Sequence, residues 1–181
     1  MTLHPIPDIA SNIVLTRDQI DTRVRELGRQ LSEELDGPIT LVTVLKGGLF
    51  FLVDLARAMD ADVTLDFLAV VPYGPGSPGS VQVTKDLDHD VQNSTVVLVE
   101  DVVDTGLTVN YVMRMLKQHA PRRLVLCTLL DKPARRIAQV GIDYTGFVVE
   151  DDFLVGYGLD VGGRYRNLPY IAAVRPEVLL G

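Results

Sequence analysis

Apolar positions follow two periods along this chain, one typical of buried strands and one typical of amphipathic helices. Val96 to Val99 is a continuous aliphatic run, the pattern of a strand that is buried on both faces of a parallel sheet. Val109, Val112 and Leu116 then fall on one face of a helix. The same patterns predict further strands at 39–45, 63–71, 124–130 and 144–149, and further helices at 20–35 and 49–56.

Weaker patterns fill the remaining segments. Thr16 and Gln19 match a capping box at the start of the first helix. Residues 81–85 alternate like an exposed strand or hairpin arm, and residues 171–174 are expected to form an edge strand. Residues 1–15 contain prolines and are expected to pack loosely. Strands alternating with helices predict a single α/β domain over residues 1–181, with a central, mostly parallel, twisted sheet flanked by helices.

The segment between the strand at 96–99 and the next helix contains most of the candidate functional side chains. Glu100 and Asp101 end the strand, and Asp104 and Thr105 begin a loop of small residues that runs to Thr108. A loop that opens a helix offers free backbone N–H groups to a phosphate. The carboxylates would repel a phosphate, but they suit ribose hydroxyls or Mg²⁺. A sugar phosphate with a bound metal ion would suit both the phosphate-binding loop and the carboxylates.

Composition narrows the class of protein. The net charge of −7 argues against nonspecific binding to nucleic acid or to an anionic membrane. The only cysteine, Cys127, lies in an apolar run and is expected to be an inert core thiol. His4, His89 and His119 lack the spacing of metal ligands. No membrane span or signal peptide is apparent, so the expected location is the cytoplasm.

One pattern is misleading. Residues 74–79 spell G-x-G-x-x-G, which is the fingerprint of a dinucleotide site. Pro75 and Pro78 remove backbone donors there, and no helical pattern follows. The segment is therefore expected to be a loop or flap.

The run Val-Leu-Val-Glu-Asp-Val-Val-Asp-Thr-Gly-Leu-Thr at 97–108 resembles the phosphoribosyl-pyrophosphate (PRPP) motif of type I phosphoribosyltransferases, in the form seen in the hypoxanthine-guanine branch. Leu45-Lys46-Gly47, Leu-Leu-Asp-Lys-Pro at 129–133 and the segment 153–160 resemble other motifs of that family, in the same order. The resemblance implies the type I fold, with a small hood built from the N-terminal segment and residues 150–181. It also implies a flexible flap at about 72–86 that contains Tyr73, although Pro72 replaces the usual serine.

The resemblance also implies roles for individual residues. Asp104 would be the catalytic acid–base group for the purine. The other roles fall into four groups: PRPP and its phosphate would be held by Glu100, Asp101, Asp104, Thr105, Gly106, Leu107 and Thr108; pyrophosphate by Lys46, Gly47 and Arg166, with a cis peptide before Lys46; the purine by Lys132, Phe153 and the carbonyl of Leu154; and Mg²⁺ by Glu100, Asp101 and Asp160.

These roles imply a purine salvage enzyme. It would transfer 5-phosphoribosyl from PRPP to N9 of hypoxanthine or guanine, with Mg²⁺, giving IMP or GMP and pyrophosphate. The family implies a homodimer or homotetramer, with no nucleic-acid or membrane partner. One alternative is a regulator on the same fold that senses PRPP or binds RNA. Another is a haloacid-type phosphatase, or a different Mg²⁺ enzyme, that uses Asp101 or Asp104, but the Asp-x-Asp motif typical of such phosphatases near the N-terminus is absent.

Overall fold

The computed structural model describes residues 6–72 and 81–179. Its main sheet has six strands in the order β4-β3-β2-β5-β6-β7. All neighbours are parallel except β3 and β4, which form an antiparallel pair. The strands are β2 (Ile39–Val44), β3 (Val63–Pro72), β4 (Val81–Lys85), β5 (Thr95–Val103), β6 (Arg123–Asp131) and β7 (Tyr144–Val148).

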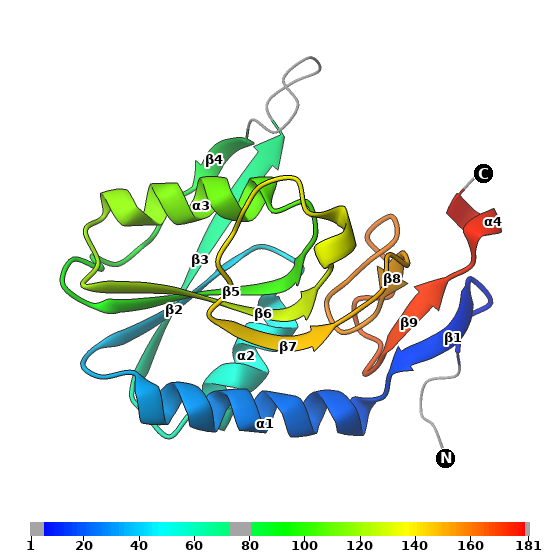
Figure 1. The fold of residues 1–181 in the computed structure, drawn as a ribbon, viewed down its shortest axis with the longest axis horizontal. Coiled ribbons are helices and arrows are strands. Elements are labelled where there is room, and N and C mark those ends of the chain that lie inside the picture. The colour runs from blue at the N-terminus through cyan, green and yellow to red at the C-terminus, as the bar shows by residue number, and fades with distance from the viewer. Residues whose placement is uncertain (1–5, 73–80, 180–181) are drawn as a thin grey trace.

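Helices cover both faces of this sheet, as Figure 1 shows. One face packs on α1 (Arg17–Glu34) and α2 (Leu49–Ala58), and the other packs on α3 (Leu107–Gln118). Successive residues of a strand therefore enter different cores: Leu41 and Val97 face α1 and α2, whereas Val42 and Leu98 face α3. The expectation of an α/β fold with a mostly parallel, helix-flanked sheet is confirmed.

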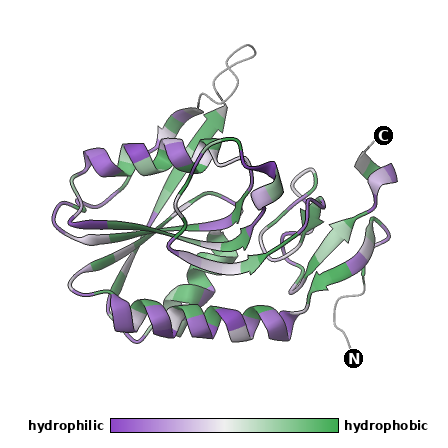
Figure 2. Cartoon of the chain, viewed as in Figure 1, coloured by the Kyte–Doolittle hydropathy of each residue, from purple (hydrophilic) through white to green (hydrophobic). Residues whose placement is uncertain are grey.

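The hydropathy pattern follows this layering. The strands of the main sheet are apolar along most of their length, while α1 and α3 alternate apolar and polar positions (Figure 2). At the start of α1, the Thr16 side chain accepts from the Gln19 N–H at 3.3 Å, and Gln19 accepts from the Thr16 N–H at 2.9 Å. The predicted capping box is therefore confirmed. Cys127 is fully buried, as expected of a core thiol.

A second, smaller sheet corrects two expectations. Residues 10–15 were expected to pack loosely, but they form β1 (Ala10–Leu15), which pairs with β9 (Ile171–Val174). The expected edge strand at 171–174 is in fact the central strand, because β8 (Leu154–Val155) pairs with its other side. Both expectations were wrong for one reason: the partners Ala10 and Val174 lie at opposite ends of the chain.

Short helices complete the chain. A 3-10 turn, η1 (Pro133–Arg135), follows β6, and α4 (Pro176–Leu179) follows β9. The predicted hairpin arm at 81–85 is β4, which is antiparallel to β3. Most of the loop of the expected flap, including Tyr73, lies outside the described residues. No helix in the described part of the chain is long and apolar enough to cross a membrane.

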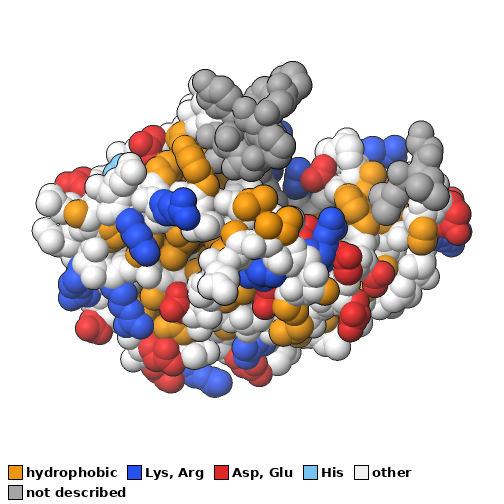
Figure 3. Space-filling view, turned by 45° about the horizontal axis from the view of Figure 1, so that its top comes forward, with side chains coloured by type: hydrophobic (Ala, Val, Ile, Leu, Met, Phe, Trp, Pro, Cys, Tyr) orange, Lys and Arg blue, Asp and Glu red, His pale blue; other side chains and the backbone are white. Residues whose placement is uncertain are grey.

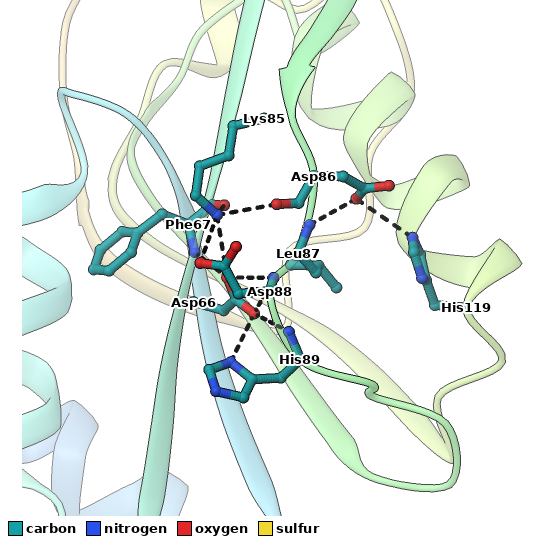
Figure 4. A network of polar contacts seen from close by, with 8 residues as sticks. All are labelled: Asp66, Phe67, Lys85, Asp86, Leu87, Asp88, His89 and His119. Atoms are coloured by element: carbon teal, nitrogen blue, oxygen red, sulfur yellow. Dashed lines mark hydrogen bonds and ion pairs between the residues drawn. The ribbon is translucent and has the colours of Figure 1, made fainter.

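A buried carboxylate fixes the chain where it leaves β4. The side chain of Asp66, on β3, is fully buried. It accepts from the backbone N–H groups of Phe67 at 2.7 Å, Asp88 at 2.9 Å and His89 at 3.0 Å (Figure 4). The His89 ring lies 3.1 Å from it and the Lys85 ammonium 3.7 Å. Burial raises the pKa of Asp66, but the hydrogen bonds from the Asp88, Phe67 and His89 amides outweigh it and hold that pKa below its usual value.

We expect Asp66→Asn to destabilise the protein at pH 7 by about 1–3 kcal/mol, because an amide cannot accept all of these hydrogen bonds. Asp62→Asn, at an exposed site just before β3, is the control and should have little effect. Urea unfolding at a series of pH values measures both. Since the folded-state pKa is lowered, the stability from the Asp66 carboxylate is present above the unfolded pKa of about 4 and is lost as the pH falls through the folded value. A deficit that persists undiminished at pH 2 would contradict this account.

Candidate active site

The parallel register of the main sheet brings the predicted residues to one edge. Val103 at the end of β5 is paired with Asp131 at the end of β6, and the Lys132 N–H donates to the Val103 carbonyl at 3.0 Å. Asp104 and Lys132 therefore leave the sheet side by side. Lys46 follows β2, the neighbour of β5 on its other side. Ligands of open α/β sheets bind at this carboxyl edge.

The loop after β5 presents the start of α3. Gly106 stands before the helix with φ of +79°, a left-handed conformation that disfavours a side chain. A Cβ there would also lie 2.8 Å from the Ala138 carbonyl oxygen. No side chain caps α3, although the Thr105 hydroxyl lies 3.4 Å from the Leu107 N–H. The first N–H groups of α3 can therefore hold a phosphate, and the exposed Thr108 lies in the same turn.

The loop after β2 packs tightly against β5. A Cβ on Gly47 would sit 1.9 Å from Oδ2 of Asp101, so only glycine fits at this position. The peptide bond between Leu45 and Lys46 is cis, as the resemblance implies. The Lys46 side chain is exposed. The predicted pyrophosphate loop and the predicted ribose-binding carboxylates are thus immediate neighbours.

Near the end of β5, Glu100 is buried without full compensation and the neighbouring Asp101 is half-buried. Glu100 is 7% exposed, and its Oε1 has no hydrogen-bond partner among the described residues. Burial, together with the neighbouring Asp101, raises the pKa of Glu100 well above its usual value. Burial also raises the pKa of Asp101, against the hydrogen bond from the Val102 N–H and the charge of Arg166. A cation or hydroxyl donors beside Glu100 and Asp101 would offset the cost of burying these carboxylates.

A pocket of about 180 Å³ gathers many of the predicted side chains. Its lining comes from the main sheet and from the segment that enters and leaves the small sheet. The predicted residues in the lining are Asp101, Asp104, Lys132, Phe153, Leu154, Asp160 and Arg166. The other predicted residues do not line this pocket: Lys46 and Gly47 lie in the loop after β2, Glu100 is buried in β5, and residues 105–108 open α3.

Lys132 is a buried cationic residue in the lining of this pocket. It is 6% exposed, and its ammonium donates to the carbonyl of Asp152. Burial lowers the pKa of Lys132, while the negative charges of Asp104 and Asp151 oppose that effect. An ammonium has three protons, so further donors remain for an acceptor in the pocket.

The small sheet supplies the apolar side of the pocket. Phe153, just before β8, is 44% exposed, which is unusual for a large apolar side chain beside a core. Leu154 is buried and starts β8. An exposed ring at the rim of a polar pocket can stack on a planar ligand.

Asp160 and Arg166 engage each other. The Arg166 guanidinium lies 2.6 Å from Oδ1 of Asp160 and also donates to the Gly158 carbonyl. The Gly163 N–H donates to the other Asp160 oxygen at 2.6 Å. A ligand that binds either side chain therefore has to share it with the other.

The donor set suits Mg²⁺ that is shared with a substrate. Among the described residues, no group of three or more His, Cys, Asp or Glu side chains converges on one point. Instead, Asp101 and Asp160 line the same pocket, and Glu100 is the buried neighbour of Asp101 in β5. Mg²⁺ commonly takes one or two carboxylates and completes its shell with phosphate oxygens and water.

Arg135 is a pocket residue that the sequence did not reveal. Its Nε lies 3.2 Å from Oδ1 of Asp104 and 3.4 Å from Oδ1 of Asp151. An arginine after a strand is normally a solvated side chain, and no motif distinguished it from Arg136 beside it.

A larger cavity of about 770 Å³ lies between α1, α2 and the chain around Tyr157 and Pro169, and none of the predicted site residues lines it.

Comparison with known proteins identifies the family of this chain. A family model described as a phosphoribosyl transferase domain matches residues 14–161. The hypoxanthine-guanine phosphoribosyltransferase of Mycobacterium avium is 45% identical over 95% of this chain and 89% of its own length. The hypoxanthine phosphoribosyltransferase of Buchnera aphidicola is 40% identical over 90% of this chain and 94% of its own.

Solved structures give the same result. A hypoxanthine phosphoribosyltransferase from Staphylococcus aureus superposes with a TM-score of 0.91 at 39% identity, covering 94% of this chain and 95% of that one. The Trypanosoma cruzi enzyme in complex with the product IMP superposes with a TM-score of 0.90 at 34% identity, covering 97% and 100%. Together with the family match over most of its length, these similarities show that this chain belongs to the phosphoribosyltransferase family, among relatives of the hypoxanthine-guanine branch.

Proposed function

We propose that this protein transfers the 5-phosphoribosyl group of PRPP to N9 of hypoxanthine or guanine, giving IMP or GMP and pyrophosphate. The observation that carries the proposal is the pocket in which Asp104 and Lys132 face Phe153 and Leu154, in a chain whose relatives are hypoxanthine-guanine phosphoribosyltransferases. No observation favours the regulatory or RNA-binding alternative. The phosphatase alternative likewise has no support in the site or the relatives.

The purine would lie in the pocket. Its planar face would stack on Phe153, and its edge would meet the backbone of Leu154. The Lys132 ammonium would donate to the oxygen at position 6. Adenine carries an amino group there, so a buried donor disfavours it. This arrangement supports selectivity for 6-oxopurines, without ranking hypoxanthine against guanine.

PRPP would lie across the carboxyl edge of the sheet. The N–H groups and hydroxyls of the loop from Asp104 to Thr108 would hold the 5′-phosphate. Glu100 and Asp101 would accept from the ribose hydroxyls, and Lys46, Gly47 and Arg166 would hold the pyrophosphate. Tyr73 would belong to the flap that covers the sugar, and the small sheet to the hood, with residues 73–80 outside the described part of the chain.

The chemistry moves one group and one proton. The bond between C1′ and the pyrophosphate oxygen breaks, the bond between C1′ and N9 forms, and the purine loses a proton. Asp104 would receive that proton near N7 as its carboxylate approaches the base. Lys46 and Arg166 would stabilise the negative charge that develops on the leaving pyrophosphate.

Glu100, Asp101 and Asp160 would hold Mg²⁺, which would supply positive charge to neutralise the phosphates. A role in purine salvage would place the enzyme in the cytoplasm, which cell fractionation would test.

We also expect a homodimer or homotetramer. The exposed Leu45, Phe50 and Val53, around the start of α2, support a subunit contact, and sedimentation would measure it.

The reaction is tested by incubating the protein with PRPP and Mg²⁺ and one base: hypoxanthine, guanine, xanthine or adenine. We expect nucleotide and pyrophosphate from at least one 6-oxopurine, little from adenine, and none after chelation of Mg²⁺. Binding of PRPP without any product would support the sensor instead. Neither turnover nor PRPP binding would refute the proposal.

We expect Asp104→Asn to lower kcat by roughly 10²–10⁴-fold, the usual contribution of a general acid–base group. Steady-state kinetics with the preferred base measures this change. The KM for PRPP should change less than kcat, because the backbone N–H groups of the phosphate loop remain. Turnover similar to wild type would remove Asp104 from the proton-transfer role.

We expect Glu100→Gln to stabilise the protein at pH 8 in the absence of Mg²⁺ by about 1–3 kcal/mol, because the variant removes a buried and incompletely hydrogen-bonded carboxylate. Because the pKa of Glu100 is raised, the stability that this residue contributes is fully present below its unfolded pKa and is lost as the pH rises through the folded value. The gain should therefore shrink toward pH 4. Thermal unfolding across this range measures it.

The same variant tests the link between Glu100 and the metal. With PRPP present, added Mg²⁺ should raise the Tm of the wild type more than that of Glu100→Gln. Equal shifts in both proteins would exclude Glu100 from the magnesium site. The exposed Glu33→Gln, on α1, is a matched control that should follow the wild type.

A further inference from the structure

The loop that carries Asp104 is held in place by the segment after η1. The Arg136 guanidinium donates to the Asp104 carbonyl at 3.0 Å and to the Val103 carbonyl at 3.3 Å, and it also pairs with Asp131. The N–H groups of Ile137 and Ala138 both donate to the Thr105 carbonyl, at 2.9 and 3.0 Å. Residues 136–138 therefore fix the backbone of the loop, but none of these contacts reaches the Asp104 carboxylate.

Arg135 contacts that carboxylate. Its Nε lies 3.2 Å from Oδ1 of Asp104. This oxygen is shielded from solvent and has no hydrogen-bond partner among the described residues, so the ion pair with Arg135 is its compensating interaction. A shielded carboxylate oxygen without such a partner would turn toward water or toward another donor.

The same guanidinium reaches the chain on the opposite side of the pocket. Nε of Arg135 lies 3.4 Å from Oδ1 of Asp151, two residues before Phe153. Arg135 thus bridges the loop after β5 and the segment that enters β8, and its side chain lines the pocket between them. The side chains of Arg135, Asp104 and Asp151 are 46%, 37% and 54% exposed. Ion pairs this exposed add little to stability, so the bridge is better explained by the geometry that it imposes.

We propose that Arg135 is a positioning residue, which holds the Asp104 carboxylate toward the purine and keeps the Phe153 segment at a fixed separation from it. The inference rests on the proposed function, because it gives Asp104 the proton-transfer role. Proton transfer requires heavy atoms within about 3 Å in the reacting complex. A displacement of about 1 Å can cost up to 100-fold in rate. An arginine that holds one oxygen of the Asp104 carboxylate can therefore control the reaction through Asp104.

A double-mutant cycle between Arg135 and Asp104 tests the inference. We expect Arg135→Ala to lower kcat about tenfold in the wild-type background and less than twofold in the Asp104→Asn background, because the variant then has no carboxylate to position. Arg135→Lys keeps a cation near both carboxylates and should recover part of the lost kcat. Arg29→Ala, on the exposed side of α1, is the matched control and should leave kcat unchanged.

The possible results distinguish the positioning role of Arg135 from the proton-transfer role of Asp104. An equal loss from Arg135→Ala in both backgrounds would show that Arg135 acts independently of Asp104 and would overturn the inference. An unchanged kcat in Arg135→Ala, with Asp104→Asn slow, would overturn it while leaving the proposed function intact. Wild-type turnover in Asp104→Asn would instead refute the role of Asp104 itself. Thermal unfolding of Arg135→Ala, expected to match the Arg29→Ala control, shows whether a loss of activity reflects unfolding.

Discussion

The register between β5 and β6 is the constraint on which the site depends. The two strands run parallel with Val103 opposite Asp131, so Asp104 and Lys132 leave the sheet as neighbours. A shift by one residue would turn every side chain of β5 to the other face, exchanging the core that packs on α1 and α2 for the core that packs on α3. The hydrophobic pattern that stabilises the fold therefore also places Asp104 next to Lys132.

The carboxyl end of β5 holds charge that the fold does not fully satisfy. Glu100 and Asp101 are close in sequence, both have raised pKa values because of burial, and the nearby Arg166 is already paired with Asp160. Such an arrangement opposes folding, and it persists because the surrounding strands are buried among apolar residues. It also makes this end of β5 attractive to hydroxyl donors and cations. The tight contact of Gly47 with Asp101 places the proposed pyrophosphate loop beside these carboxylates.

Local patterns allowed most of the main sheet to be predicted from the sequence. The aliphatic run of β5 and the capping box at Thr16 each depend on neighbouring residues, and each appears in the structure where it was expected. The small sheet could not be predicted in this way, because β1 finds its partner at the other end of the chain. Arg135 escaped for a related reason: its significance comes from Asp104 and Asp151, which become its neighbours only in the folded protein.

The pocket lies between the two sheets, so the separation of the sheets sets the distance between the side chains that line it. Asp104 and Lys132 belong to the main sheet, whereas Phe153 and Leu154 belong to the segment that enters the small one. Two polar contacts join the halves at the pocket: the Lys132 ammonium with the Asp152 carbonyl, and the Arg135 guanidinium with Asp151. Both contacts come from the chain just after β6 and reach consecutive residues. In Figure 3, side chains of both charges meet where the main body adjoins the smaller lobe. The two sheets also share a hydrophobic core, in which Leu129 of β6 belongs to the same buried cluster as Leu154 and Ile171 of the small sheet. This core holds the sheets together without the polar contacts, so changes in those contacts should alter the alignment of the proposed purine before they alter the stability of either sheet.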